Sequence, residues 1–235
     1  MPLNISQFTI QQVAFQVRYR DAFLIFDKTG SLSEEARKRW PTMKIEKGEP
    51  RSSSFTVDNK YRLQVEIDKA SIIAFNPKPS LEEFIDDAHA FEEIIRNALE
   101  IVEYNRVGFK TFYRKEHETN EDATMDIVSS FGLKLPQGKH FNIEGKIPLV
   151  TLEHRWEDEL LCVTSQLRSQ EQSWEFTPPI EAEGLEPKKT KINFVSYAPD
   201  YFTRKSISVN QLNVKKWIEN AFHLIKRDSK IFLEK

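Results

Sequence analysis

The sequence predicts an α+β fold in which an antiparallel sheet is covered on one face by two long helices. Several short segments alternate apolar and polar residues, which is typical of half-buried strands. Two long segments, at residues 80–103 and 208–235, place apolar residues at helical spacing. The chain has 235 residues, 39% of them hydrophobic and 11% aromatic, which is enough for one substantial core or for two small cores that share a sheet.

The first half of the predicted fold spans about residues 11–104 and opens with a strand. Residues 13–20 alternate, with apolar side chains on one side and Gln or Arg on the other. Ser31 and Glu34 have capping-box spacing and predict a short helix, which ends before Pro41 because proline restricts the residue ahead of it.

A hairpin follows, with the turn pair Asp58-Asn59 between alternating segments at 55–58 and 60–68. Residues 71–75 predict a third strand.

A long helix closes this half. Ser80 is its predicted N-cap, and Glu83 stands at capping-box spacing. Its apolar face consists of Phe84, Ala88, Phe91, Ile95, Ala98 and Val102.

The second half spans residues 105–235 and repeats this order of elements. They are a strand at 106–114, a charged loop at 115–122, a short helix at 123–131 before Gly132, strands at 148–156, 159–168 and 191–197, and a closing helix. Glu157-Asp158 is the predicted turn between the first two of these three strands. Ser208 or Asn210 is the predicted cap of the closing helix, which has Trp217 on its apolar face.

The two halves share the order of their elements but no recognisable residues. If the order reflects a duplication, residues 1–104 and 105–235 form one compact pseudo-two-fold domain with a curved antiparallel sheet and both long helices on one face. This topology resembles the helix-grip and TATA-binding-protein-like folds, which serve DNA, small-ligand and protein binding alike. The fold class therefore selects no function.

Four local features resemble a family of sporadically distributed, uncharacterised bacterial proteins of about this length. They are the strand Phe15-Gln16-Val17-Arg18-Tyr19, the helix end Trp40-Pro41, the segment Tyr104-Asn105-Arg106-Val107-Gly108-Phe109 and the closing helix around Trp217. The family pattern continues with an aromatic and a polar residue, to which Lys110-Thr111-Phe112-Tyr113 corresponds only roughly. The resemblance implies a bacterial, mobile-gene context and carries over no catalytic residue.

Composition excludes several classes of protein. The 34 Lys and Arg nearly cancel the 36 Asp and Glu, so the chain as a whole is neither a polybasic nucleic-acid binder nor an acidic disordered tail. One cysteine, the absence of a signal-peptide-type start and the lack of about 18 consecutive apolar residues predict a soluble, cytoplasmic protein. With seven glycines the chain has no phosphate-binding glycine loop, and we expect no cofactor.

No complete catalytic constellation is recognisable. Cys162 and His154 are the candidate nucleophile and base, but strand alternation predicts that they lie on opposite faces of the sheet. Glu144-Gly145-Lys146 has the Glu-x-Lys spacing of nucleases, although its glycine points to a turn.

A charged loop offers oxygen and imidazole groups for a metal, at Glu116, His117, Glu118, Glu121 and Asp122. Their spacing matches no known metal motif, so we interpret the loop as solvated surface and expect no metal site.

The two long helices carry opposite charge. Residues 80–103 hold eight acidic residues and one Arg, a net charge of −7, whereas residues 208–235 hold six basic and three acidic residues, a net charge of +3. The plain interpretation is two solvated helix faces. The sharper hypothesis is that the acidic helix docks a basic partner, including the basic helix of another copy.

Basic residues also recur at alternate strand positions on the face opposite the helices. We therefore predict binding residues at Arg18, Arg20, Arg62, Arg106, Lys110 and Arg114. Phe112 shares their face, and a basic sheet with interleaved aromatic residues can bind phosphates and stacked bases.

The sequence favours a non-enzymatic binding or adaptor protein that uses this sheet face or the acidic helix, most simply with a protein partner. Nucleic acid and self-association are further possibilities for the partner, and no membrane partner is expected. One alternative is a small-ligand sensor with an apolar pocket between sheet and helix near Phe15, Tyr61 and Phe91. Another is a carboxylate-dependent hydrolase or nuclease.

Overall fold

The computed structural model describes residues 3–49, 51–76, 80–134, 149–176 and 188–234. Within them the chain forms a nine-stranded antiparallel sheet, a two-stranded sheet, four α-helices and two short 3-10 helices. The α+β class and the large antiparallel sheet are thus confirmed.

The large sheet contains strands from both halves of the sequence. They are β1 (Thr9–Arg18), β2 (Lys44–Glu49), β3 (Ser52–Val57), β4 (Tyr61–Glu66), β5 (Lys69–Phe75), β7 (Arg106–His117), β8 (Thr151–Glu157), β9 (Leu161–Phe176) and β10 (Lys188–Thr203). Their order across the sheet is β2-β3-β4-β5-β1-β7-β10-β9-β8. The small sheet pairs β6 (Glu103–Tyr104) with β11 (Ile207–Ser208), and the 3-10 helices are η1 (Ile5–Gln7) and η2 (Val209–Gln211).

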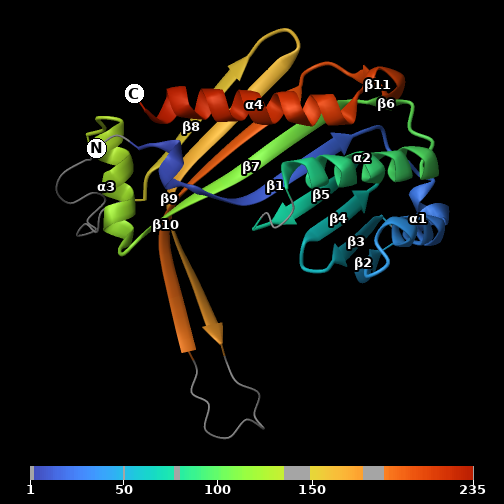
Figure 1. Ribbon diagram of the computed structural model, residues 1–235, viewed down its shortest axis with the longest axis horizontal. Helices are drawn as coiled ribbons and strands as arrows, with labels where there is room; N and C mark the ends of the chain where they lie inside the picture. The colour runs from blue at the N-terminus through green and yellow to red at the C-terminus, as the bar shows by residue number, and fades with distance from the viewer. Residues whose placement is uncertain (1–2, 50, 77–79, 135–148, 177–187, 235) are drawn as a thin grey trace, which may run out of the picture.

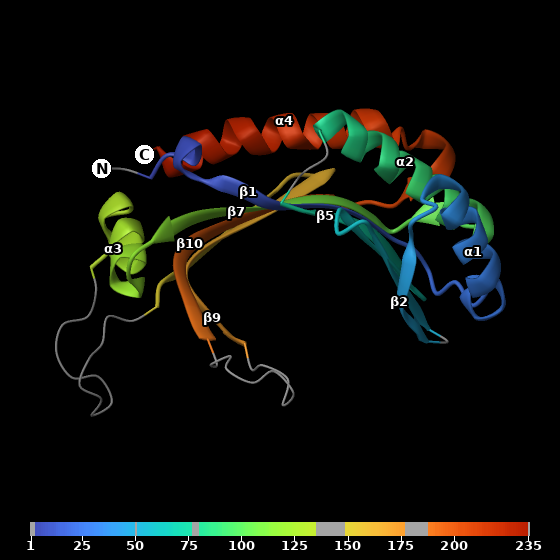
Figure 2. The ribbon, with the colours of Figure 1, turned by 60° about the horizontal axis from the view of Figure 1, so that its bottom comes forward.

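The four helices are α1 (Ile25–Arg39), α2 (Leu81–Ala98), α3 (Asn120–Ser130) and α4 (Val214–Leu233). Helices α2 and α4 lie on the same face of the sheet, as Figure 2 shows. Helix α1 packs against α2, and α3 packs near β9 and β10 at the other end of the molecule (Figure 1).

The core lies between the sheet and the two helices α2 and α4. Phe109 of β7 packs between Phe84 of α2 and Phe222 of α4, with ring centroids 6.2 and 6.3 Å away. Phe15 is buried beside Trp217 of α4. Both halves of the chain therefore contribute to one continuous hydrophobic core.

The sheet is strongly curved, and its face away from α2 and α4 is concave (Figure 2). Strands β9 and β10 pair over sixteen residues each and extend as an arm beyond the rest of the sheet (Figure 1). The arm borders one side of the concave face, and β2 to β4 border the other.

The predicted N-cap of α2 is confirmed, because Ser80 Oγ accepts a hydrogen bond from Glu83 N. The predicted turn after β3 is confirmed as well. Asp58 and Asn59 both have positive φ, as its backbone requires, and Lys60 N donates to Val57 O.

The prediction for α1 was wrong at its start. The helix begins at Ile25 rather than Ser31, and Ser31 Oγ donates to Lys28 O instead of capping. Ile25 and Leu32 are both buried on the face of α1 that meets the core, so packing carries the helix through Gly30.

Several strand limits differ from the prediction. β1 ends at Arg18, β7 runs on to His117, and the edge strand β2 was missed. The strands β9 and β10 are longer than predicted because they pair with each other beyond the body of the sheet.

The predicted caps of the closing helix were also wrong. Asn213 caps α4, its side chain accepting from Lys216 N, while Ser208 precedes the short helix η2. No helix in the described part of the chain has both the length and the apolar composition needed to cross a membrane.

Candidate functional site

Strand alternation gives the sheet one covered and one uncovered face. Val13, Phe15 and Val17 of β1 point into the core, so Ala14, Gln16 and Arg18 point the other way. We call the set of side chains directed away from α2 and α4 the open face.

Five of the six predicted binding residues lie on the open face. Arg18 is paired in register with Arg106, and Lys110 with Ala14, while Arg62 and Arg114 have the same orientation on β4 and β7. Arg20 lies beyond the end of β1 and does not belong to the sheet.

Several of these cations are neutralised by neighbours. The ion pairs are Arg62 with Glu46 (3.1 Å), Arg106 with Asp200 (2.8 Å) and Arg114 with Glu116 (2.7 Å). Lys69 of β5, a further open-face cation opposite Arg18, pairs with Glu66 (3.1 Å). Among the described residues, Arg18, Lys110 and Arg168 have no ion-pair partner. The ion pairs therefore neutralise only part of the positive charge on the open face.

The remaining positive charge is concentrated on the central strands. The described open-face side chains of β1, β7, β9 and β10 include five cations and two carboxylates, a net charge of +3. The cations are Arg18, Arg106, Lys110, Arg114 and Arg168, and the carboxylates are Glu116 and Asp200.

Asp200 lies among these cations. Burial raises the pKa of its carboxyl group, while Arg106 and Lys110 act in the opposite direction. Arg106 Nη2 donates to Asp200 Oδ2 across neighbouring strands. This contact offsets part of the repulsion between Arg106 and Arg18.

Arginine side chains on the open face lie over phenylalanine rings. The guanidinium carbon of Arg106 is 3.7 Å from the ring centre of Phe202, and that of Arg62 is 5.5 Å from Phe75. Arg114 lies 5.8 Å from the ring centre of Phe194. These stacks restrict the guanidinium groups while leaving donors to bind another group.

A hollow lies in the open face where β1, β7, β10 and the base of the arm meet. It is lined mainly by Gln12, Phe75, Phe112, Arg114, Gln170 and Phe194. Such a set combines flat apolar surfaces with amide and guanidinium groups, so it can stack on a planar ring and bind its polar edge.

The sequence-based prediction missed the open-face residues of β9 and β10, among them Arg168, Gln170 and Asp200. The signal was present: polar residues continue at alternate positions from Thr164 to Gln172, past the predicted end of that strand.

The acidic helix is partly neutralised within the chain, since four of its eight carboxylates form the ion pairs given next. The pairs are Glu83 with Lys60, Asp86 with Lys215 (2.6 Å), Asp87 with Arg39 (2.8 Å) and Glu92 with Arg96 (3.0 Å). The basic helix α4 of the same chain packs against α2. Part of the opposite charge on α2 and α4 is therefore used in contacts within the chain itself, such as Asp86 with Lys215.

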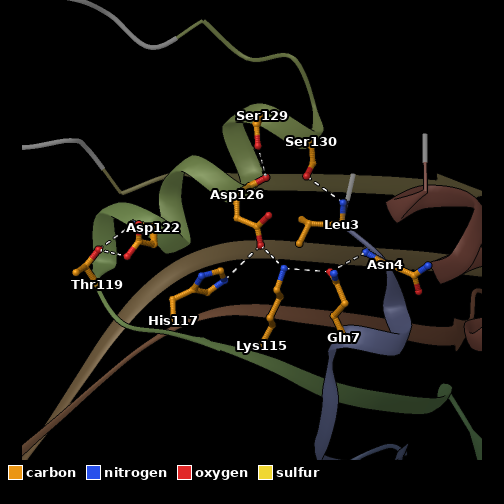
Figure 3. A network of polar contacts seen from close by, with 10 residues as sticks. All are labelled: Leu3, Asn4, Gln7, Lys115, His117, Thr119, Asp122, Asp126, Ser129 and Ser130. Carbon is orange, nitrogen blue, oxygen red and sulfur yellow. Dashed lines mark hydrogen bonds and ion pairs between the residues drawn. The ribbon is translucent and has the colours of Figure 1, made fainter. Parts of the chain in front are cut away.

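The prediction of a charged loop at 115–122 was wrong, because β7 runs to His117 and α3 begins at Asn120. Of the five residues weighed there as metal ligands, His117 lies in a polar network between β7 and α3, shown in Figure 3. Asp126 Oδ2 lies 2.6 Å from Lys115 Nζ and 3.3 Å from His117 Nε2. Lys115 also donates to Gln7 Oε1 near the N-terminus. The Asp126 carboxylate that faces His117 is thus already paired with the Lys115 ammonium. The network joins β7 to α3 and to the N-terminal segment.

Cys162 and His154 lie on opposite faces of the sheet, as predicted, although the register differs. Cys162 pairs with Glu157, and His154 pairs with Ser165. The loop is longer than a two-residue turn because Asp158 Oδ1 accepts from both Leu160 N and Leu161 N. Glu144-Gly145-Lys146 lies outside the described residues.

An apolar cavity of about 290 Å³ opens between α4 and strands β8 to β10. Its walls include Trp156, Tyr197, Tyr201 and Phe232, and the Tyr201 hydroxyl donates to Asp228 at its rim. The pocket predicted around Phe15, Tyr61 and Phe91 differs in place, since these three side chains are buried against other aromatic rings of the core.

No protein-family model matches this sequence, and no curated protein matches it.

Proposed function

We propose that this protein is a non-enzymatic binding protein whose open face engages an anionic macromolecule, with single-stranded nucleic acid as the partner class that suits the face best. The observation that carries the proposal is the group of cations that have no ion pair within the described part of the chain, Arg18, Lys110 and Arg168, on strands that also carry the half-buried Phe112. Basic grooves bind the phosphate backbone, and aromatic rings stack on unpaired bases.

The arginine–phenylalanine stacks support this proposal. Arg106 over Phe202 and Arg114 over Phe194 hold planar donors at the surface of the sheet. Because these side chains are already restricted, they lose less conformational entropy when they bind a phosphate or a base edge.

The strand order supports the proposed duplication. From the centre outward, β1 and β7 are followed by β5 and β10, then β4 and β9, then β3 and β8. In this proposal residues 1–104 and 105–235 are equivalent units, the first carrying β2 in addition, and their topology is TATA-binding-protein-like. The concave face formed at their junction has the curvature to enclose an elongated partner (Figure 2).

Fluorescence anisotropy with a labelled single-stranded oligonucleotide tests the function. The variant Lys110→Glu/Arg168→Glu reverses two open-face cations, and we expect it to abolish binding measurable for the wild type. The matched control, Lys216→Glu/Lys226→Glu, makes the same change in net charge on exposed positions of α4 on the other side of the sheet. Equal losses in both variants would refute a role of the open face.

Arg62 is a weaker site for such a test, because its guanidinium is held by both Glu46 and Phe75.

If the wild type binds no oligonucleotide, the proposal of a nucleic-acid partner fails and a protein adaptor becomes the leading alternative.

A small-ligand sensor is the second candidate, and the cavity beside α4 favours it. Its volume of about 290 Å³ and its walls of Tyr197, Tyr201 and Phe232 suit a small, mainly apolar molecule. Burial raises the pKa of Tyr197 to about 12, so its hydroxyl stays protonated at neutral pH.

Native mass spectrometry of the purified protein tests this candidate. A retained ligand would add the same mass to each chain, and Tyr201→Phe would weaken retention of a ligand that binds at the Tyr201–Asp228 pair. A cavity that accepts no ligand from a library of small apolar molecules would refute it.

A further inference from the structure

The two edges of the large sheet differ in how they are protected. The edge strand β2 contains Lys44, Lys47 and Gly48, and its pairing with β3 is broken by an irregularity between Ile45 and Lys47. Such features prevent one sheet edge from pairing with another. The opposite edge strand, β8, has no lysine, glycine or proline and pairs with β9 without a register shift.

The outward backbone groups of β8 follow from its bonds to β9. Ser169 N donates to Val150 O, and Asp158 N donates to Leu161 O. Because inward and outward groups alternate along an antiparallel strand, residues 152, 154 and 156 also point toward β9. The N–H and C=O groups of Thr151, Glu153, Arg155 and Glu157 therefore point away from the sheet.

Exposed apolar side chains gather beside the same edge. Trp156 is 48% exposed, Leu160 in the following loop is 63% exposed, and Ile231 near the end of α4 is 64% exposed. The Trp156 ring packs on Phe232, next to Ile231. Trp156 and Ile231 line the same cavity, and exposed apolar side chains that lie together mark an interaction site.

We propose that two copies of the chain associate through β8, antiparallel to each other, with a two-fold axis at His154. This register places Glu153 opposite Arg155 of the second copy, and Arg155 opposite its Glu153. On the other face, Leu152 meets Trp156 of the second copy. The seven residues of β8 thus form two cross-strand ion pairs and two apolar pairs with themselves, and Glu153 of the second copy joins the pair that Arg155 already makes with Glu157 of its own strand (2.8 Å).

Charge selects this register over its neighbours. An axis at Glu153 would place two glutamates opposite each other, and an axis at Arg155 would do the same with two arginines. An axis between two residues would pair an outward backbone group with an inward one, which forms no ladder.

The same geometry joins the open faces of the two copies. Glu153 and Arg155 lie on the open face, and antiparallel pairing in one sheet keeps such residues on one side. The dimer therefore presents a surface twice as long, although its formation does not depend on what that surface binds.

Sedimentation equilibrium of the full chain tests the proposal, and we expect a dimer. Arg155→Glu and Glu153→Arg each place like charges opposite each other at two positions, which we expect to weaken dimerisation by about tenfold or more. The double variant Glu153→Arg/Arg155→Glu restores the ion pairs and should recover most of the affinity. Lys47→Glu on the opposite edge strand, β2, is the matched control, and its measured molecular mass should remain that of a dimer.

Glu153→Pro gives a second test that does not rely on charge. Proline removes an outward N–H while leaving the bonds between β8 and β9 intact, so the chain should fold and remain monomeric. A monomeric wild type, or a dimer that survives Glu153→Pro and both single charge reversals, would overturn the proposal.

Discussion

Arg106 and Asp200 form an ion pair of 2.8 Å between neighbouring strands in the centre of the open face. The pair lies beside Arg18 and Lys110, so Asp200 holds the only carboxylate close to three cations in the described part of this region. A partner with negative charge would compete with this carboxylate for Arg106.

Replacing Asp200 should therefore strengthen the binding of an anionic partner. We expect Asp200→Asn to increase oligonucleotide affinity several-fold at low salt, because one opposing charge is removed without a change of shape. Glu219→Gln, an exposed carboxylate on α4, is the control for net charge. Unchanged or lower affinity in Asp200→Asn would contradict a phosphate-binding role for Arg106.

His117 makes stability depend on pH. Burial lowers the pKa of His117 below its ordinary value of 6.5, despite the opposing effect of Asp126, while Lys115 lowers it further. The folded state then binds this proton less readily than the unfolded state, so the contribution to stability is full above pH 6.5 and is lost as the pH falls below it.

We expect wild type to lose stability relative to His117→Gln as the pH falls from neutral through this window. Denaturant unfolding of both proteins at several pH values measures the difference in their unfolding free energy. The carboxylates are common to both proteins, so their pH-dependent contributions cancel in this difference. A difference that is constant with pH would contradict the burial of His117 in the network of Figure 3.

Two neighbouring residues of α4 should differ sharply in their effect on stability. Phe232 is 5% exposed and packs against Phe131, Tyr197 and His154, whereas Ile231 is 64% exposed. Truncation of Phe232 to Ala should cost about 3–5 kcal/mol, and that of Ile231 less than about 0.5 kcal/mol. Thermal or chemical unfolding of the two variants checks the orientation of the helix, and equal losses would show it to be wrong.

Two hydroxyl residues test where helices α3 and α1 begin. Thr119 caps α3, with Oγ1 accepting from Asp122 N, whereas Ser31 lies inside α1. Thr119→Ala should cost about 1 kcal/mol of unfolding free energy, and Ser31→Ala should cost little. A larger loss for Ser31→Ala would favour the helix start at residue 31.

The elements that the sequence predicts best are those whose signal is local. Helix α2 begins at its predicted cap, Ser80, and buries the predicted apolar residues from Phe84 to Ile95, although it ends at Ala98 and leaves Val102 exposed. The alternation in β1 and β7 likewise places Arg18, Arg106 and Lys110 on one face. These signals depend only on residues within a few positions of each other.

The features that the sequence did not predict depend on distant residues. Arg106 and Asp200 are 94 positions apart, and no local pattern pairs them. Asp86 of α2 finds its partner, Lys215, on α4 of the same chain, which the charge of the two segments alone could not distinguish from a second molecule. Helix α1 passes through Gly30 because tertiary burial of Ile25 and Leu32 outweighs a weak local preference.

The salt dependence of oligonucleotide binding is the most direct test of the central claim, that the open face binds an anionic macromolecule through Arg18, Lys110 and Arg168. If Arg18, Lys110 and Arg168 each neutralise a phosphate, log K should fall against log salt with a slope of about −2 or steeper, at roughly −0.7 for each phosphate of a single strand. Lys110→Glu should make that slope shallower by about the contribution of one phosphate. Absence of binding at about 50 mM salt, or a slope near zero, would contradict the account.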